Sequence, residues 1–153
     1  MRIEKKVTVD APRHLVWDHV TEPANYCAFL EGLTRWDVEG DKHTGLGARY
    51  RMLLRVGAAD VGGLIEIVEW QPGSDMAWSS VTGVDQRGRW RLRELPDGRT
   101  RVTFRFAYGV PGGGLAGMIA ERVASRSLSH RFQQMLLTIK RTVESQRESA
   151  AVG

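Results

Sequence analysis

One uninterrupted helical stretch at the end of the chain constrains the fold more than any other feature. It runs from Leu115 to about Arg147 and contains no proline and, past Gly117, no glycine. Apolar side chains recur along it at helical spacing and form one stripe, which comprises Met118, Ala124, Leu128, Phe132, Met135, Ile139 and Val143. The pattern predicts one long amphipathic helix, and the rest of the chain has to cover its apolar stripe.

The chain before this helix is dominated by segments in which apolar and polar residues alternate, as in half-buried strands. About seven strands are predicted, over residues 2–9, 33–39, 48–55, 61–70, 75–82, 87–95 and 99–108. Turn-forming residues separate the later strands, at Pro72-Gly73, Gly83 and Pro96-Asp97-Gly98. These short connections favour an antiparallel meander, because parallel pairs need long crossovers.

Two short helices are predicted between the first and second strands. Asp10 is a suitable N-cap and Pro12 suits the first turn of a helix over residues 13–20. Thr21-Glu22-Pro23 interrupts this helix, and residues 24–30 form the second one. The result is an α+β domain over residues 1–148, with a frayed tail over 149–153. We expect a strongly bent sheet, and because one helix cannot fill its hollow, an apolar cavity between the two.

Composition narrows the class of protein. The 153 residues are 42% hydrophobic and 26% charged, which is ordinary for a globular domain. Cys27 is the only cysteine, so no intrachain disulfide forms. The chain has no apolar run of about 18 residues and no secretory signal, so we expect a cytoplasmic protein. The four histidines lack metal-ligand spacing, and no nucleotide motif occurs; we therefore expect neither a metal nor a cofactor.

Several landmarks resemble the START-related, birch-pollen-allergen-like (SRPBCC) superfamily, which has the helix-grip fold. They lie at residues 9–12 (Val-Asp-Ala-Pro), 16–17 (Val-Trp), 45–47 (Gly-Leu-Gly), 70–72 (Trp-Gln-Pro), 89–92 (Arg-Trp-Arg-Leu) and 98–103 (Gly-Arg-Thr-Arg-Val-Thr). Within the superfamily, the chain is most similar to the bacterial polyketide cyclase/dehydrase and lipid-transport family. The resemblance covers nearly the whole chain and implies a helix-grip fold with a cavity for a hydrophobic molecule. Its motifs mark turns and not catalytic groups, so they specify fold better than function.

Residues that share the inward parity of the strands or the helix stripe are the candidate ligand contacts. They are Tyr50, Met52, Leu54, Trp78, Trp90, Phe104, Phe106, Tyr108, Met118, Glu121, Ser125, Leu128 and Phe132. Such an aromatic wall suits a flat or long hydrophobic ligand, with tyrosine hydroxyls to orient it. The alternative is that these side chains simply pack as core.

Catalytic candidates are few. Tyr50, Ser80, Tyr108 and Glu121 would serve an enzyme that resembles the family's aromatase/cyclases. A carboxylate in an apolar lining has a raised pKa and can act as an acid or base, although Glu121 would lie at the surface if the helix phase drifts. No acid–base pair is evident, so binding of a lipid, a polyketide-like compound or another apolar metabolite is the main hypothesis, and an aromatase/cyclase or dehydratase is the alternative.

Arginines occupy the outward parity of three strands: Arg49, Arg51, Arg55, Arg87, Arg89, Arg91, Arg93, Arg101 and Arg105. They predict a basic outer face, which either binds an anionic partner or is solvated and partly neutralised by Glu66, Glu69 and Glu94. The net charge of +4 disfavours nucleic acid as a partner and is compatible with transient contact at a membrane surface. Exposed strand edges are compatible with a dimer.

Overall fold

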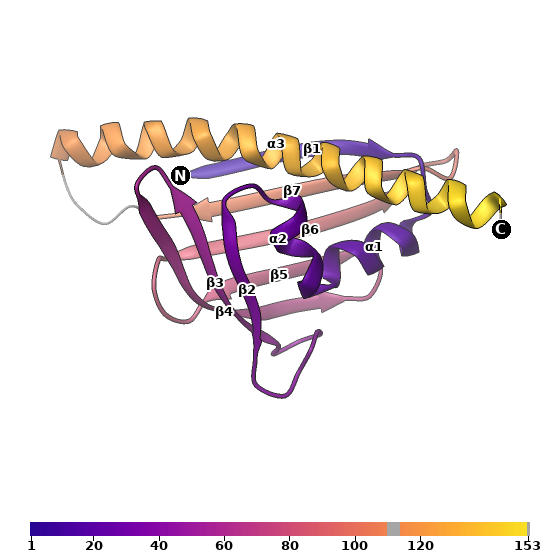
Figure 1. Ribbon diagram of the computed structural model, residues 1–153, viewed down its shortest axis with the longest axis horizontal. Helices are drawn as coiled ribbons and strands as arrows, with labels where there is room; N and C mark the ends of the chain where they lie inside the picture. The colour runs from indigo at the N-terminus through magenta and orange to yellow at the C-terminus, as the bar shows by residue number, and fades with distance from the viewer. Residues whose placement is uncertain (110–113, 153) are drawn as a thin grey trace.

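The computed structural model describes residues 1–109 and 114–152, and describes side chains over residues 1–109 and 125–152. Its elements are β1 (Arg2–Val9), α1 (Arg13–Thr21), the 3-10 turn η1 (Pro23–Asn25), α2 (Tyr26–Phe29), β2 (Leu33–Glu39), β3 (Arg49–Val56), β4 (Ala59–Gln71), β5 (Asp75–Ser80), β6 (Gln86–Glu94), β7 (Thr100–Tyr108) and α3 (Gly114–Val152). This order confirms the α+β helix-grip fold (Figure 1).

The strands form one curved antiparallel sheet of seven strands in the order β1-β7-β6-β5-β4-β3-β2. From β2 onward each strand pairs with the next along the chain, as the short turns predict. Strands β1 and β2 are neighbours in sequence but lie at opposite edges of the sheet. Helix α1, η1 and α2 therefore carry the chain from one edge to the other, and α1 contacts both β6 and α3 on the way.

Helix α3 runs beside β1 along the sheet (Figure 1). Its Phe132, Ile139 and Val143 side chains are fully buried, as their spacing predicts. Leu136, which the predicted stripe does not include, is fully buried as well. The helix continues to Val152, past the end at about Arg147 that the sequence indicates. Fraying of residues 149–153 stays a prediction. No helix in the described ranges combines the length and apolarity needed to cross a membrane.

The start of α1 differs from its prediction. Pro12 occupies the N-cap position and no side chain caps the helix. The prediction of Asp10 as the N-cap is wrong. Its carboxylate instead accepts a hydrogen bond from Arg147 of α3 at 2.7 Å. Its backbone N–H donates to Glu144 at 2.9 Å. The residue that the local pattern assigns to a helix cap instead joins the end of β1 to α3. The segment that follows α1 is the 3-10 turn and the single helical turn of α2.

Candidate functional site: an aromatic interior and a basic outer face

The concave side of the sheet, α2 and α3 enclose a cavity of about 20 Å³ among the described residues. Its lining comprises Tyr26, Leu30, Trp36, Met52, Leu54, Trp78, Gln86, Trp90, Phe104, Phe106, Phe132 and Met135. A space of this size holds about one water molecule. The aromatic rings of the lining therefore fill most of the hollow that the sequence predicts to be open.

Strand register explains how the rings meet. Trp78, Gly88 and Phe106 are consecutive partners across β5, β6 and β7. Gly88 has no side chain, and the Trp78 indole occupies the space: a Cβ on Gly88 would lie 2.1 Å from Cζ2 of Trp78. The absence of a side chain at Gly88 thus determines the position of the Trp78 ring.

The rings pack against one another in tilted and stacked pairs. Tyr26 stacks on Trp36 with centroids 4.3 Å apart, and Trp36 meets Trp78 edge-on at 5.4 Å. Phe104 lies 5.0 Å from Phe132, which brings the ring of α3 onto the sheet. Contacts of this geometry add about 0.5–1.5 kcal/mol each beyond the burial of apolar area.

Three polar atoms of this lining have no hydrogen-bond partner among the residues that the structure describes. They are Nε1 of Trp36, Nε1 of Trp78 and Oε1 of Gln86. A buried polar atom without a partner costs about 1–3 kcal/mol, so such atoms are rare in folded proteins. All three belong to residues that line one small cavity. The interior therefore offers two N–H donors and one carbonyl acceptor to a molecule that enters it.

Three neighbouring polar groups of the interior already have partners. The Nε1 atom of Trp90 donates to the Tyr26 hydroxyl at 3.1 Å, and this hydroxyl donates to the Val20 carbonyl at 2.6 Å. Burial raises the pKa of Tyr26 well above its ordinary value. The Gln86 amide nitrogen lies 3.2 Å from Sδ of Met52. Tyr26 thus stays neutral and holds Trp90 in place.

The residues selected from the sequence fall into groups. Seven of them line the cavity: Met52, Leu54, Trp78, Trp90, Phe104, Phe106 and Phe132. Tyr50 and Leu128 are buried in the surrounding core, and Ser125 is partly exposed on α3. Tyr108 lies beside Phe106 at the rim of the sheet, 5.8 Å between centroids. The side chains of Met118 and Glu121 lie outside the described residues. The role of these residues as ligand contacts stays a prediction.

The described catalytic candidates do not form a cluster. Tyr50, Ile65 and Ser80 are register partners across β3, β4 and β5, so a strand separates Tyr50 from Ser80. The Tyr50 hydroxyl donates to the carbonyl of His43 at 2.7 Å, and burial raises the pKa of Tyr50. The hydroxyl of Ser80 accepts from the Gln86 backbone at 3.2 Å. These groups have structural partners and no common substrate position.

Five lining residues lie outside the set of ligand contacts predicted from the sequence: Tyr26, Leu30, Trp36, Gln86 and Met135. Met135 was in the helix stripe, and Trp36 shares the inward parity of its strand. Gln86 precedes the predicted start of β6 but keeps the parity of Gly88 and Trp90. A polar residue at an inward position is the signal that would have identified it.

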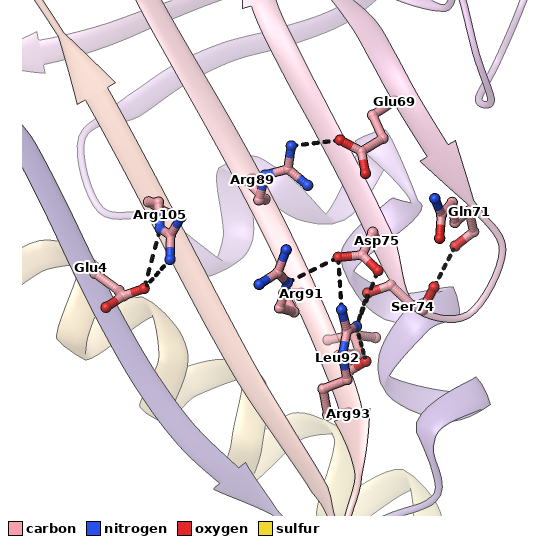
Figure 2. Close-up of polar contacts among 10 residues, drawn as sticks. All are labelled: Glu4, Glu69, Gln71, Ser74, Asp75, Arg89, Arg91, Leu92, Arg93 and Arg105. Carbon is pink, nitrogen blue, oxygen red and sulfur yellow. Dashed lines mark hydrogen bonds and ion pairs between the residues drawn. The ribbon is translucent and has the colours of Figure 1, made fainter.

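Ion pairs on the outer face neutralise much of the arginine charge (Figure 2). Arg49 pairs with Glu66, and Arg89 with Glu69 at 2.5 Å. Asp75 accepts from both Arg91 and Arg93, each at 3.1 Å. Asp75 is not among the acids predicted to neutralise this face, and Glu94, which is, forms no ion pair in the described part of the chain. The remaining pairs are Arg51–Glu39, Arg55–Asp60 and Arg105–Glu4.

The amino-acid sequence matches one known protein family over most of its length. The model of the family described as "Polyketide cyclase / dehydrase and lipid transport" matches residues 1–144. The chain belongs to this family. The resemblance found in the sequence is thereby confirmed, and the match supports a hydrophobic-ligand-binding or cyclase role. Among curated proteins, none matches the chain.

Solved structures of similar proteins confirm the fold. TTHA0849 from Thermus thermophilus is 16% identical with a TM-score of 0.80, over 95% of this chain and 99% of that one. The Zhui aromatase/cyclase from Streptomyces sp. R1128 is 20% identical with a TM-score of 0.69, over 97% and 93%. StfQ, a di-domain aromatase/cyclase of the steffimycin biosynthetic pathway, is 16% identical with a TM-score of 0.74, over 96% of this chain and 51% of that one.

Proposed function

We propose that this family member binds a ring-containing apolar molecule that carries oxygen atoms, in the interior between the sheet and α3. The three unpartnered atoms of Trp36, Trp78 and Gln86 carry the proposal. An oxygen of a ketone or phenol can accept from either indole, and a hydroxyl can donate to the Gln86 carbonyl. A pure hydrocarbon would leave all three atoms unsatisfied.

The small cavity defines how binding occurs. About 20 Å³ is far below the roughly 300–1,000 Å³ of ordinary ligand pockets. A guest must therefore displace lining side chains and binds only the fraction of the protein in which these side chains have moved apart. Its apparent affinity is reduced by that fraction. Recovery of hydrogen bonds at the three polar atoms supplies part of the compensation.

Mass spectrometry under native conditions tests the proposal directly. Protein purified from its own host should carry a conjugated, oxygenated compound that is released on denaturation. Binding of 1-naphthol and of naphthalene, followed by calorimetry, should favour 1-naphthol. Purely apo protein that binds neither probe would refute the proposal.

The variant Gln86→Leu separates polar recognition from simple burial. We expect it to weaken 1-naphthol binding roughly 5–10-fold, because one hydrogen bond contributes about 1 kcal/mol, and to leave naphthalene binding unchanged. Gln134→Leu changes the same side chain at an exposed position of α3 and is the control. Equal binding of both probes by the wild type and by Gln86→Leu would contradict the assigned role of Gln86.

A cyclase is the second candidate, favoured because Zhui and StfQ are aromatase/cyclases. In this chain the interior would fold a reactive chain by shape, and the indole N–H groups would polarise its carbonyls. Turnover of a polyketide-like substrate that is lost in a Trp78→Phe variant, with substrate binding retained, would support it. Unchanged turnover in that variant would count against it.

A further inference from the structure

A second hollow lies on the opposite, outer face of the sheet. It encloses about 670 Å³ over β4, β5, β6, β7 and the start of β1. Small residues with outward parity form much of its floor: Ala77, Ser79 and Ala107. Their size leaves space between the longer side chains around them, so the hollow is a consequence of small residues at outward positions of β5 and β7. This volume lies within the range of small-molecule sites.

Register places two arginines on either side of this floor. Arg87 of β6 pairs with Ala107 of β7, and Ala107 pairs with Arg2 of β1. Because neighbouring strands lie about 4.8 Å apart, the two arginine Cα atoms are roughly 10 Å apart across the alanine. In the next row, Arg89 pairs with Arg105. Four guanidinium groups thus belong to the lining of one hollow.

Two of these four arginines are already paired with carboxylates, and two are available to bind an anion. Arg89 pairs with Glu69 and Arg105 with Glu4 (Figure 2), and these hydrogen bonds lower the pKa of each carboxyl, so both acids stay ionised at neutral pH. Arg2 and Arg87 are exposed and form no ion pair among the described residues.

Two carboxylates belong to the lining itself. Glu69 is engaged by Arg89, and Asp85 lies beside the Ser80 hydroxyl at 3.5 Å. Four arginines against these two carboxylates and Glu4, which pairs with Arg105, leave one positive charge in excess at the hollow.

We propose that this outer hollow binds a compact polyanion, a small molecule or headgroup with at least two phosphate groups, between Arg2 and Arg87. Guanidinium groups bind phosphate oxygens through paired hydrogen bonds and remain charged at every physiological pH. The concave shape favours a compact ligand. A macromolecule would need about 800 Å² of matched surface, and much of the remaining basic surface is already neutralised, as in the pairing of Arg91 and Arg93 with Asp75.

Titration of the whole protein with tripolyphosphate at low salt tests the site, by calorimetry and by amide chemical shifts. The amides of Ser79, Arg87 and Ala107 should move, and the affinity should fall as salt is added. The double variant Arg2→Gln/Arg87→Gln should lose on the order of tenfold or more in affinity, since it removes charge-assisted hydrogen bonds. Both positions are exposed and form no ion pair in the described part of the chain, so the fold should be retained.

The double variant Lys6→Gln/Arg101→Gln is the matched control. It removes the same charge from the same face, at exposed positions outside the hollow that form no ion pair within the described ranges. We expect its affinity for tripolyphosphate to stay within about twofold of wild type. Equal losses in the two double variants, or no binding at all, would overturn the proposal.

Phosphatidylcholine vesicles with added phosphatidylinositol bisphosphate identify the source of the phosphate groups. Vesicle binding that depends on Arg2 and Arg87 assigns a lipid headgroup. Tripolyphosphate binding alone assigns a free phosphate compound.

Discussion

Asp75 is a buried carboxylate that joins two arginines of the outer face. Its side chain is only 7% exposed and accepts from Arg91 and Arg93. Burial opposes its ionisation, but the hydrogen bonds from Arg93 and Arg91 outweigh burial and lower the pKa of Asp75. A lowered pKa in the folded state stabilises the protein above the unfolded value of about 4, and this contribution is lost as the pH falls through the folded pKa.

The variant Asp75→Asn should therefore lower the free energy of unfolding at pH 7 by about 1–3 kcal/mol, which is the scale of hydrogen bonds to a charged group. The difference from wild type should shrink as the pH falls through the lowered folded pKa of Asp75, because the wild-type carboxyl then becomes protonated. Urea denaturation at several pH values measures both effects. Asp41→Asn, in an exposed loop, should change little. A difference that is constant with pH would contradict the role of the charge.

Gly88 controls the aromatic interior through the space that it leaves. Gly88→Ala should force Trp78 to move and lower the free energy of unfolding by about 1–3 kcal/mol, as overpacking usually does. Thermal unfolding measures the loss, and adding Trp78→Phe should recover part of it. Gly109→Ala is the control, since its added Cβ would meet nothing closer than Asp85 at 3.7 Å. Equal melting temperatures for wild type and Gly88→Ala would refute the packing argument.

At the scale of elements, α3 is fastened to the end of β1 by a polar cluster. Glu144 accepts from the Asp10 backbone at 2.9 Å and from Lys140 at 2.6 Å, and Lys140 also donates to the Thr8 carbonyl at 3.0 Å. Arg147 binds both the backbone carbonyl and the carboxylate of Asp10. These polar contacts hold α3 to the end of β1, in addition to the packing of its apolar stripe.

Removing the central carboxylate should loosen this attachment. We expect Glu144→Ala to lower the free energy of unfolding by about 1 kcal/mol and to speed hydrogen exchange at the Asp10 amide. Glu148→Ala, one turn further along the exposed end of α3, is the matched control and should change neither quantity. Unchanged exchange at Asp10 in Glu144→Ala would show that the hydrogen bond does not hold the strand to the helix.

The helices and strands could be predicted because the spacing of apolar residues along the sequence depends on local backbone geometry. Alternation identified the strand faces, and the inward set that contains Trp78, Trp90 and Phe104 meets around the cavity. Partnerships between elements were not predictable in the same way. The local pattern at Asp10 predicts a helix cap, but its actual partner is on α3, which is distant in sequence. Asp75 contacts Arg91 and Arg93 because of the register between β5 and β6. Tyr26 reaches the interior because β2 lies at the far edge of the sheet.

For the whole molecule, the sheet separates two proposed sites on opposite faces. Ligands that occupy one face should leave the affinity of the other unchanged, because a paired sheet lies between them and distant sites usually act additively. The increases in melting temperature caused by 1-naphthol and by tripolyphosphate should therefore add. Thermal unfolding with each compound and with both measures this. An increase with both that departs clearly from the sum would indicate coupling, for which Trp78 and Gln86, which line both hollows, are the shared residues.

The packing of the lining also gives the interior its own spectroscopic signal. Trp36, Trp78 and Trp90, three of the five tryptophans in the chain, line the cavity. Tyr26 and Trp36 stack with their planes only 9° apart. Rings held in one fixed, asymmetric arrangement produce near-ultraviolet circular dichroism, which disappears when tertiary packing is lost. A guest that parts these rings must alter that spectrum, so the unlabelled protein reports on its own occupancy.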